Sequence, residues 1–174
     1  MSGPAAVHRL EDPFAFARAA GSHDGQVAIA AMLRLQDRLA ADAGQVSFAV
    51  RGRQDQRQRP VLELEITGNL SLRCDRCLAP LDFPLQLRST VLLAHPGEVL
   101  PDADDPESPE SIEAGQELDL QELVEDEILL GLPLSVRHDQ GKCSGGTGLR
   151  QANEQGKPFS GLAALLDTQQ TNTD

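Results

Sequence analysis

The chain has few aromatic side chains: its 174 residues include five Phe but no Trp and no Tyr. A core without large rings has to be built mainly from Leu, Val, Ile and Ala. The same scarcity argues against recognition of single-stranded RNA by stacking of bases on aromatic side chains.

Positive charge is also scarce, because 15 Lys and Arg stand against 27 Asp and Glu and leave a formal net charge of −12. Such a surface repels phosphate groups, so we expect no tight binding to free nucleic acid. The charge is uneven: residues 98–127 hold 13 acids and no Lys or Arg, whereas residues 51–88 hold seven Arg against five acids. From this basic middle we select five candidates for contacts with RNA phosphates or a partner, namely Arg51, Arg53, Arg73, Arg76 and Arg88. A solvated sheet face is the alternative explanation for them.

Long hydrophobic runs are missing as well. The charged residues Arg9, Glu11 and Asp12 precede any apolar run, and later runs are interrupted within a few residues. We therefore expect neither a signal peptide nor a membrane-spanning helix. An odd number of cysteines without a secretory signal suits a reducing compartment, so we expect a cytoplasmic protein that does not bind membranes.

Hydrophobic and polar residues alternate over residues 46–50, 62–74 and 85–93. A period of two is typical of strands that bury one face. Because polar linkers separate these runs, the pattern predicts an antiparallel meander with one buried face and one solvated face.

Two segments have the apolar spacing of amphipathic helices. One covers residues 27–41 and is closed by Gly44, although its first residues, 27–29, could instead form a strand. The other covers residues 119–131 and begins with an acidic cap. Asp12-Pro13 is typical of the start of a third, shorter helix. We therefore predict an α+β domain whose antiparallel sheet is covered by two or three helices.

This single domain should span residues 1–143. Within it, residues 95–117 are rich in Pro, Asp, Glu and Ser and lack periodicity, which predicts a solvated, mobile acidic loop. Residues 144–174 should form a flexible tail with a short helix near 158–167.

Three cysteines are the main candidates for chemistry. Cys74 and Cys77 are separated by two residues, a spacing that lets two thiolates share one tetrahedral zinc ion. Two further ligands are needed, and Cys143 with either His138 or His95 can supply them. Zinc is therefore the one cofactor that the sequence suggests, with Cys74, Cys77, Cys143 and His138 as the favoured ligands.

Two other interpretations of the CxxC pair stay open. Vicinal thiols can exchange disulfides, which would make the chain a thiol oxidoreductase, although this pair follows a strand rather than beginning a helix. Alternatively, Cys74 packs inward as a small hydrophobic residue and Cys77 shapes a turn. His138-Asp139 has no associated nucleophile, and Gly145–Gly148 lacks the flanking strand and helix of a phosphate loop. We therefore expect no enzymatic activity.

Several motifs, taken together, resemble the bacterial YceD family. They are Cys74-Asp-Arg-Cys-Leu-Ala-Pro80, Glu117-Leu-Asp-Leu120, Val124-Glu-Asp-Glu-Ile-Leu-Leu130, Leu132-Pro133, His138-Asp139, Cys143 and Lys157-Pro-Phe159. The resemblance runs from about Asp12 to Leu166 and is poorest from Ser144 to Leu149.

Members of that family are described as large ribosomal RNA subunit accumulation proteins, which affect the synthesis, processing or stability of 23S rRNA. The resemblance thus implies a non-enzymatic factor in large ribosomal subunit biogenesis in the bacterial cytoplasm. Its partners would be a precursor of the large subunit, a ribosomal protein or an assembly factor. The family has no established catalytic residues to carry over. The alternatives are a thiol oxidoreductase and a structural zinc-binding interaction module.

Overall fold

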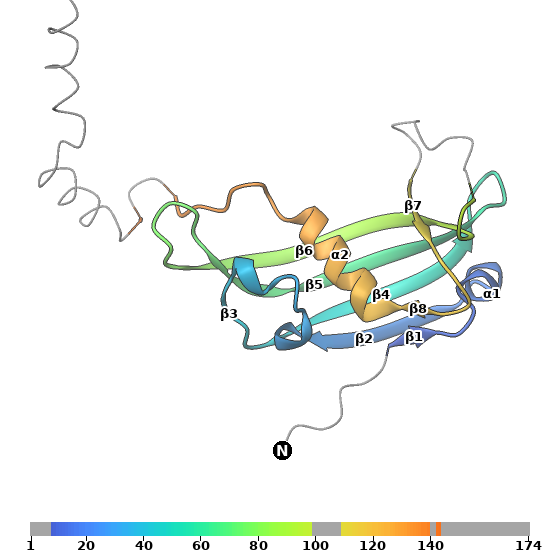
Figure 1. Cartoon of the computed structure of the whole chain (residues 1–174), viewed down its shortest axis with the longest axis horizontal. Helices are drawn as coiled ribbons and strands as arrows, with labels where there is room; N and C mark the ends of the chain where they lie inside the picture. Colours follow the sequence, from blue (N-terminus) through green and yellow to red (C-terminus); the bar gives the residue numbers. More distant parts are fainter. Residues whose placement is uncertain (1–7, 99–108, 140–141, 144–174) are drawn as a thin grey trace, which may run out of the picture.

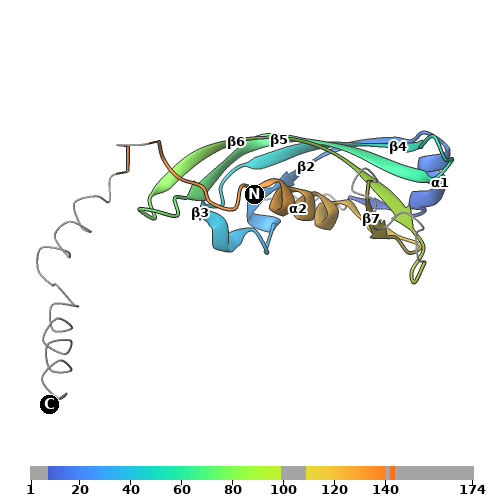
Figure 2. The same ribbon diagram turned by 90° about the horizontal axis from the view of Figure 1, so that it is seen from above.

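A computed structural model describes residues 8–98, 109–139 and 142–143 of the chain. In these residues a six-stranded sheet arches over α2, which lies on the concave side (Figures 1 and 2). The strand order is β2-β4-β5-β6-β7, with β3 paired to β5, and β1 pairs with β8 in a separate small sheet. The elements are β1 (Arg9–Leu10), α1 (Pro13–Arg18), β2 (Ser22–Ala28), η1 (Ile29–Ala31), η2 (Gln36–Arg38), β3 (Leu39–Ala41), β4 (Gln45–Gln54), β5 (Pro60–Arg73), β6 (Pro80–Ala94), β7 (Glu110–Glu113), β8 (Leu118–Asp119) and α2 (Leu120–Gly131).

The three long strands confirm the predicted antiparallel meander. Val50 pairs with Leu64 between β4 and β5, and Leu62 pairs with Val91 between β5 and β6. Their side chains alternate, so that the apolar set lies on the concave face, where it is buried. The fold is therefore α+β, as the sequence indicates.

Helix α2 covers the concave face and begins as its sequence predicts. The Asp119 side chain accepts hydrogen bonds from the backbone N–H groups of Gln121 and Glu122, at 2.9 and 3.3 Å, which satisfies two of the helix's unpaired donors. A stripe of buried residues faces the sheet, namely Leu120, Leu123, Val124 and Ile128. The helix ends at Gly131, two residues before the proline that cannot continue it.

The predicted helix over residues 27–41 is wrong. Residues up to Ala28 belong to β2, the edge strand beside β4, and the rest form two short 3₁₀ turns followed by β3. The buried residues Ile29, Met32 and Leu35 are spaced by three, which suits a sequence of tight turns as well as a helix. Pairing with β4 extends the sheet and overrides the local pattern. Gly44 takes a left-handed backbone (φ +103°) in the turn into β4 rather than closing a helix.

The predicted acidic loop over residues 95–117 is also partly wrong. Residues Glu110–Glu113 form β7, which pairs in parallel with the end of β6. Only Ile112 of this strand is apolar, so its sequence carries almost no strand signal. Residues 99–108 and the predicted tail with its helix near 158–167 lie outside the described residues.

Gly52 provides a test of how closely α1 packs on the sheet. A Cβ atom at this position would lie 2.6 Å from both the Ala17 Cα and the Phe16 carbonyl oxygen, and backbone atoms cannot move aside cheaply. We predict that Gly52→Ala lowers the free energy of unfolding by about 1–3 kcal/mol in urea titrations. Gly115→Ala is the matched control, because a Cβ there meets nothing within 4 Å and should change stability by less than about 0.5 kcal/mol. Equal stability of both variants would contradict this packing.

Candidate metal centre

The two vicinal cysteines lie in a tight turn between β5 and β6. The Leu78 N–H donates to the Cys74 carbonyl at 2.8 Å, and the Cys74 N–H donates to the Ala79 carbonyl at 3.0 Å. Leu78 takes a left-handed backbone (φ 61°), unusual for a branched residue, which completes the turn. The turn brings the sulfurs of Cys74 and Cys77 to the same side.

The segment after α2 is held against this turn by two hydrogen bonds. The Asp75 N–H donates to the Val136 carbonyl at 2.8 Å, and the Val136 N–H donates to the Asp75 carboxylate at 2.7 Å. These bonds place His138 beside the turn. Asp75 was not among the residues selected from the sequence, although its position inside the CxxC motif is a signal that could have identified it.

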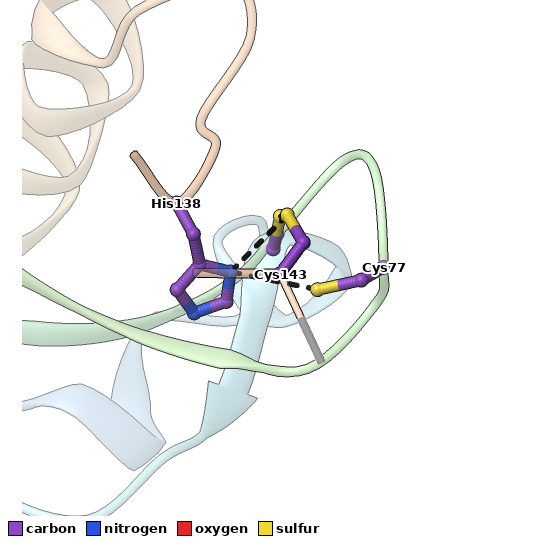
Figure 3. Close-up of side chains that lie close together, drawn as sticks. Cys77, His138 and Cys143 are labelled. Carbon is purple, nitrogen blue, oxygen red and sulfur yellow. Dashed lines mark hydrogen bonds between the residues drawn. The ribbon is translucent and has the colours of Figure 1, made fainter. Parts of the chain in front are cut away.

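Four side chains converge at this point, as the favoured ligand set requires. The sulfurs of Cys74, Cys77 and Cys143 and a ring nitrogen of His138 all lie within 4.8 Å of one another. Figure 3 shows the Cys77 and Cys143 sulfurs turned toward the same His138 nitrogen. His95, the other imidazole considered, is not in this cluster and instead stacks on Phe14, with ring centroids 4.0 Å apart.

Three of the six distances among the four ligand atoms are close to the edges of a zinc tetrahedron. Zinc bonds of about 2.3 Å to sulfur and about 2.0 Å to nitrogen imply S···S edges near 3.8 Å and S···N edges near 3.5 Å. The Cys74 and Cys143 sulfurs are 3.9 Å apart, and His138 Nδ1 lies 3.4 Å from Cys77 Sγ and 3.9 Å from Cys143 Sγ. A disulfide needs about 2.05 Å between sulfurs, and all three thiols are free.

His138 is oriented for coordination through Nδ1. Its other nitrogen, Nε2, lies 3.0 Å from the Pro80 carbonyl oxygen, which can only accept a hydrogen bond. In the neutral ring the proton therefore sits on Nε2, which leaves the Nδ1 lone pair able to bind a metal beside the sulfurs. A backbone carbonyl that fixes the tautomer in this way is a common outer partner of metal-binding histidines.

The surroundings of Cys74 favour its thiolate. Complete burial of this residue by itself raises the pKa of the thiol. Backbone N–H groups of His138, Cys77 and Arg76 donate to the sulfur, outweigh burial and lower the pKa to about 5. The thiolate, which is the form that binds metal, therefore predominates at neutral pH.

The pKa values of His138 and Cys143 are also shifted by their neighbours in the cluster. A hydrogen bond with Cys74, followed by one with the Pro80 carbonyl, raises the pKa of His138. Burial and hydrogen bonds with the other two sulfurs raise the pKa of Cys143. Without a cation Cys143 thus resists ionisation beside Cys74, whereas a divalent metal would stabilise a thiolate at this position.

The candidate arginines fall into two groups instead of forming one patch. On the convex face of the sheet, Arg53 pairs with Glu63 and Arg88 pairs with Glu65, while Arg51 lies opposite Glu63. These pairs offset the positive charge that the sequence suggested for RNA.

The remaining two lie near the metal-ligand end of the sheet. Arg73 donates to the Leu39 carbonyl at 3.2 Å, and Arg76 Nη1 lies 4.0 Å from Cys143 Sγ. Three thiolates on a divalent metal leave one negative charge, and Arg76 is placed to offset it.

The chain matches a known protein family. A family model described as "Large ribosomal RNA subunit accumulation protein YceD" matches residues 62–166, more than half of the chain. The matched segment contains most of β5, all of β6 and α2, and the four residues of the cluster. No curated protein and no solved structure matches the chain. Within the described residues, no helix is long and apolar enough to cross a lipid bilayer.

The lowered pKa of Cys74 predicts how the reduced, metal-free chain responds to pH. Its folded pKa near 5 lies below the value of about 8.5 for an unfolded cysteine. The resulting stabilisation is therefore fully present above about pH 8.5 and is lost as the pH falls toward 5. Thiolate absorbance at 240 nm should show one transition near pH 5, which Cys74→Ser removes. Titration of all three thiols near pH 8.5 would contradict this environment.

Proposed function

The chain belongs to the YceD family, whose model matches more than half of it, and on this premise we propose a non-enzymatic factor in large ribosomal subunit biogenesis. The family description, large ribosomal RNA subunit accumulation, carries the proposal. In finer terms, the protein would act in the bacterial cytoplasm on the synthesis, processing or stability of 23S rRNA. Its partners would be a large-subunit precursor, a ribosomal protein or an assembly factor.

The charge distribution supports action on a particle or protein rather than on free RNA. The net charge is −12, and two convex-face arginines, Arg53 and Arg88, are paired with glutamates. A phosphate that approaches them has to compete with these carboxylates and with the negative field of the whole chain. Tight binding to free 23S rRNA is therefore not part of the proposal.

Within this function, the four-residue cluster serves as a structural zinc site. Three sulfurs and one imidazole nitrogen would fill all four positions around a tetrahedral zinc ion and would leave no open position for a substrate or an activated water. The ligands come from the β5–β6 turn and from the segment after α2. Zinc would therefore join these two parts of the chain, which are separated by about 60 residues of sequence.

A thiol oxidoreductase is the second candidate, and the lowered pKa of Cys74 is the observation that favours it. Two features argue against it. Cys74 has no exposed surface, so a substrate disulfide has no path to its sulfur. The pair also lies in a turn between strands, where backbone N–H groups of His138 and of the turn, rather than a helix N-terminus, stabilise the thiolate. A metal site accounts for the same N–H donors and for the convergence of Cys143 and His138.

Zinc content tests the structural site. Protein purified without a His-tag should contain about one zinc per chain by plasma mass spectrometry, because four suitable ligands are already assembled. Cys77→Ser should lose most of this zinc, whereas His95→Gln, which changes an imidazole outside the cluster, should keep it. Clearly substoichiometric zinc in the wild-type protein, or equal zinc in Cys77→Ser, would leave the cysteines as packing residues.

Gene deletion tests the role in the ribosome. Loss of the protein should reduce 23S rRNA relative to 16S rRNA, change the 23S precursor pattern and lower the ratio of large to small subunits. A plasmid copy of the wild-type gene should restore all three. The proposal fails if rRNA blots and sucrose-gradient profiles of the deletion strain match those of its parent.

A further inference from the structure

Three exposed leucines come from neighbouring segments on the concave side of the sheet. Leu33 is 76% exposed, Leu130 is 65% exposed and Leu134 is 99% exposed. Among the described residues Leu78 of the cysteine turn is also exposed (69%), whereas the other large apolar side chains are buried or half-buried. Leu33 lies between η1 and η2, Leu130 in the last turn of α2, and Leu134 just after it. Single exposed leucines are common, but several in adjoining segments indicate a binding surface. We call these three residues the leucine surface.

A buried carboxylate fixes the segment that carries Leu33. Glu125 of α2 is only 6% exposed, and its Oε1 accepts the backbone N–H groups of Arg34 at 2.6 Å and Leu35 at 3.1 Å. Burial of a carboxylate is costly unless it is paired and fully hydrogen-bonded. This contact therefore specifies one position for the turn, with Leu33 directed into solvent.

The guanidinium group of Arg34 strengthens the same contact. It lies 3.3 Å from the Glu125 carboxylate, donates to the Glu122 carbonyl at 3.1 Å and pairs with Asp126. Further along, Arg38 Nη2 donates to the Pro133 carbonyl at 3.4 Å. The segment from residue 34 to residue 38 is thus hydrogen-bonded at one end to α2 and at the other to Pro133, the residue that precedes Leu134.

Leu134 is held between two anchored neighbours. Pro133 accepts the hydrogen bond from Arg38, and Val136 makes both of its backbone hydrogen bonds with Asp75, beside the cysteine cluster. The leucine surface is therefore ordered before a partner arrives, which reduces the entropy lost on binding. It also adjoins the candidate metal centre through the same short segment.

Negative charge flanks the leucine surface. Asp37 and Glu122 are exposed and Glu127 is half-buried. Of the nearby cations, Arg34 and Arg38 are engaged with α2 and Pro133, and the exposed Arg137 donates to the Ser135 hydroxyl. Asp126 and Glu127 lie one turn before Leu130, on the same side of α2. A partner that inserts apolar side chains here would gain from lysines or arginines around them.

We infer that the leucine surface binds a basic, amphipathic protein segment on the large-subunit precursor. This inference rests on the proposed function, because that function supplies the particle, and it adds which face of the chain makes contact. Charge complementarity selects a basic protein over RNA, whose phosphates would meet Asp37, Glu122 and Glu127.

The experiment uses the full chain and begins by testing its premise. Wild-type protein should restore 23S rRNA in the deletion strain; if it does not, the proposed function fails whatever this surface does.

The variant Leu33→Ser/Leu130→Ser/Leu134→Ser should keep the wild-type unfolding midpoint and zinc content, since all three side chains are exposed. It should bind purified large-subunit precursor particles at least about tenfold more weakly in sedimentation assays and fail to restore 23S rRNA. Gln86→Ser, on exposed strand surface, is the matched control.

Two results would overturn the inference while leaving the proposed function intact. One is a leucine variant that binds particles and restores 23S rRNA like wild type. The other is loss of binding in Arg53→Ser/Arg88→Ser together with retention in the leucine variant, which would assign the contact to the convex face.

Photo-crosslinking identifies what occupies the surface. A benzoylphenylalanine side chain in place of Leu33 should crosslink, within the purified particle, to a Lys- and Arg-rich segment of a protein. Crosslinks to 23S rRNA, or to a second copy of this chain, would overturn the inference. The same is true if the Leu33 probe gives no crosslink while a Gln86 probe does.

Discussion

After α2 the chain runs back to the β5–β6 turn. The candidate metal centre and the leucine surface both depend on this path. Two hydrogen bonds between Asp75 and Val136 hold this return, and they lie between the cysteines of the turn and the exposed Leu134. His138 reaches the cluster because Val136, two residues earlier, is fixed beside the turn. A metal bound by all four ligands would reinforce these bonds. Metal binding and the docking of the segment after α2 on the β5–β6 turn would then be thermodynamically coupled.

The scarcity of aromatic side chains explains why polar contacts are needed to position the segments on the concave side. The buried set is mainly aliphatic and lies between one arched sheet and a single 12-residue helix. The concave side also carries irregular turns and short strands, which bury less surface than a second long helix would. Local polar anchors therefore position these segments: Asp119 at the start of α2, Glu125 under the turn at residue 34, and Asp75 at the cysteine turn. The convex face, in contrast, has cross-strand Arg–Glu pairs and little exposed apolar surface.

Elements with a strong local period were predictable from the sequence, whereas elements defined by distant pairing were not. The three long strands and α2 follow from their alternation, stripe and cap. The 27–41 segment was mistaken for a helix because 3₁₀ turns and helices share apolar spacing, and only pairing with β4 distinguishes them. Strand β7 depends on parallel pairing with β6, which no local pattern records.

The four clustered residues were predictable because few thiols and imidazoles were available. The burial of Glu125 was not, because nothing in the charge run from residue 125 to residue 127 distinguishes it from its neighbours.

X-ray absorption at the zinc K-edge tests most directly whether the four converging side chains form a metal centre. For untagged protein, we predict a four-coordinate spectrum with three sulfur atoms at about 2.3 Å and one nitrogen at about 2.0 Å. Such a shell requires Cys143 and His138 to be bound together with the CxxC pair. A spectrum dominated by oxygen and nitrogen, or one with only two sulfurs, would contradict the account, because the segment after α2 would then not be joined to the β5–β6 turn through metal.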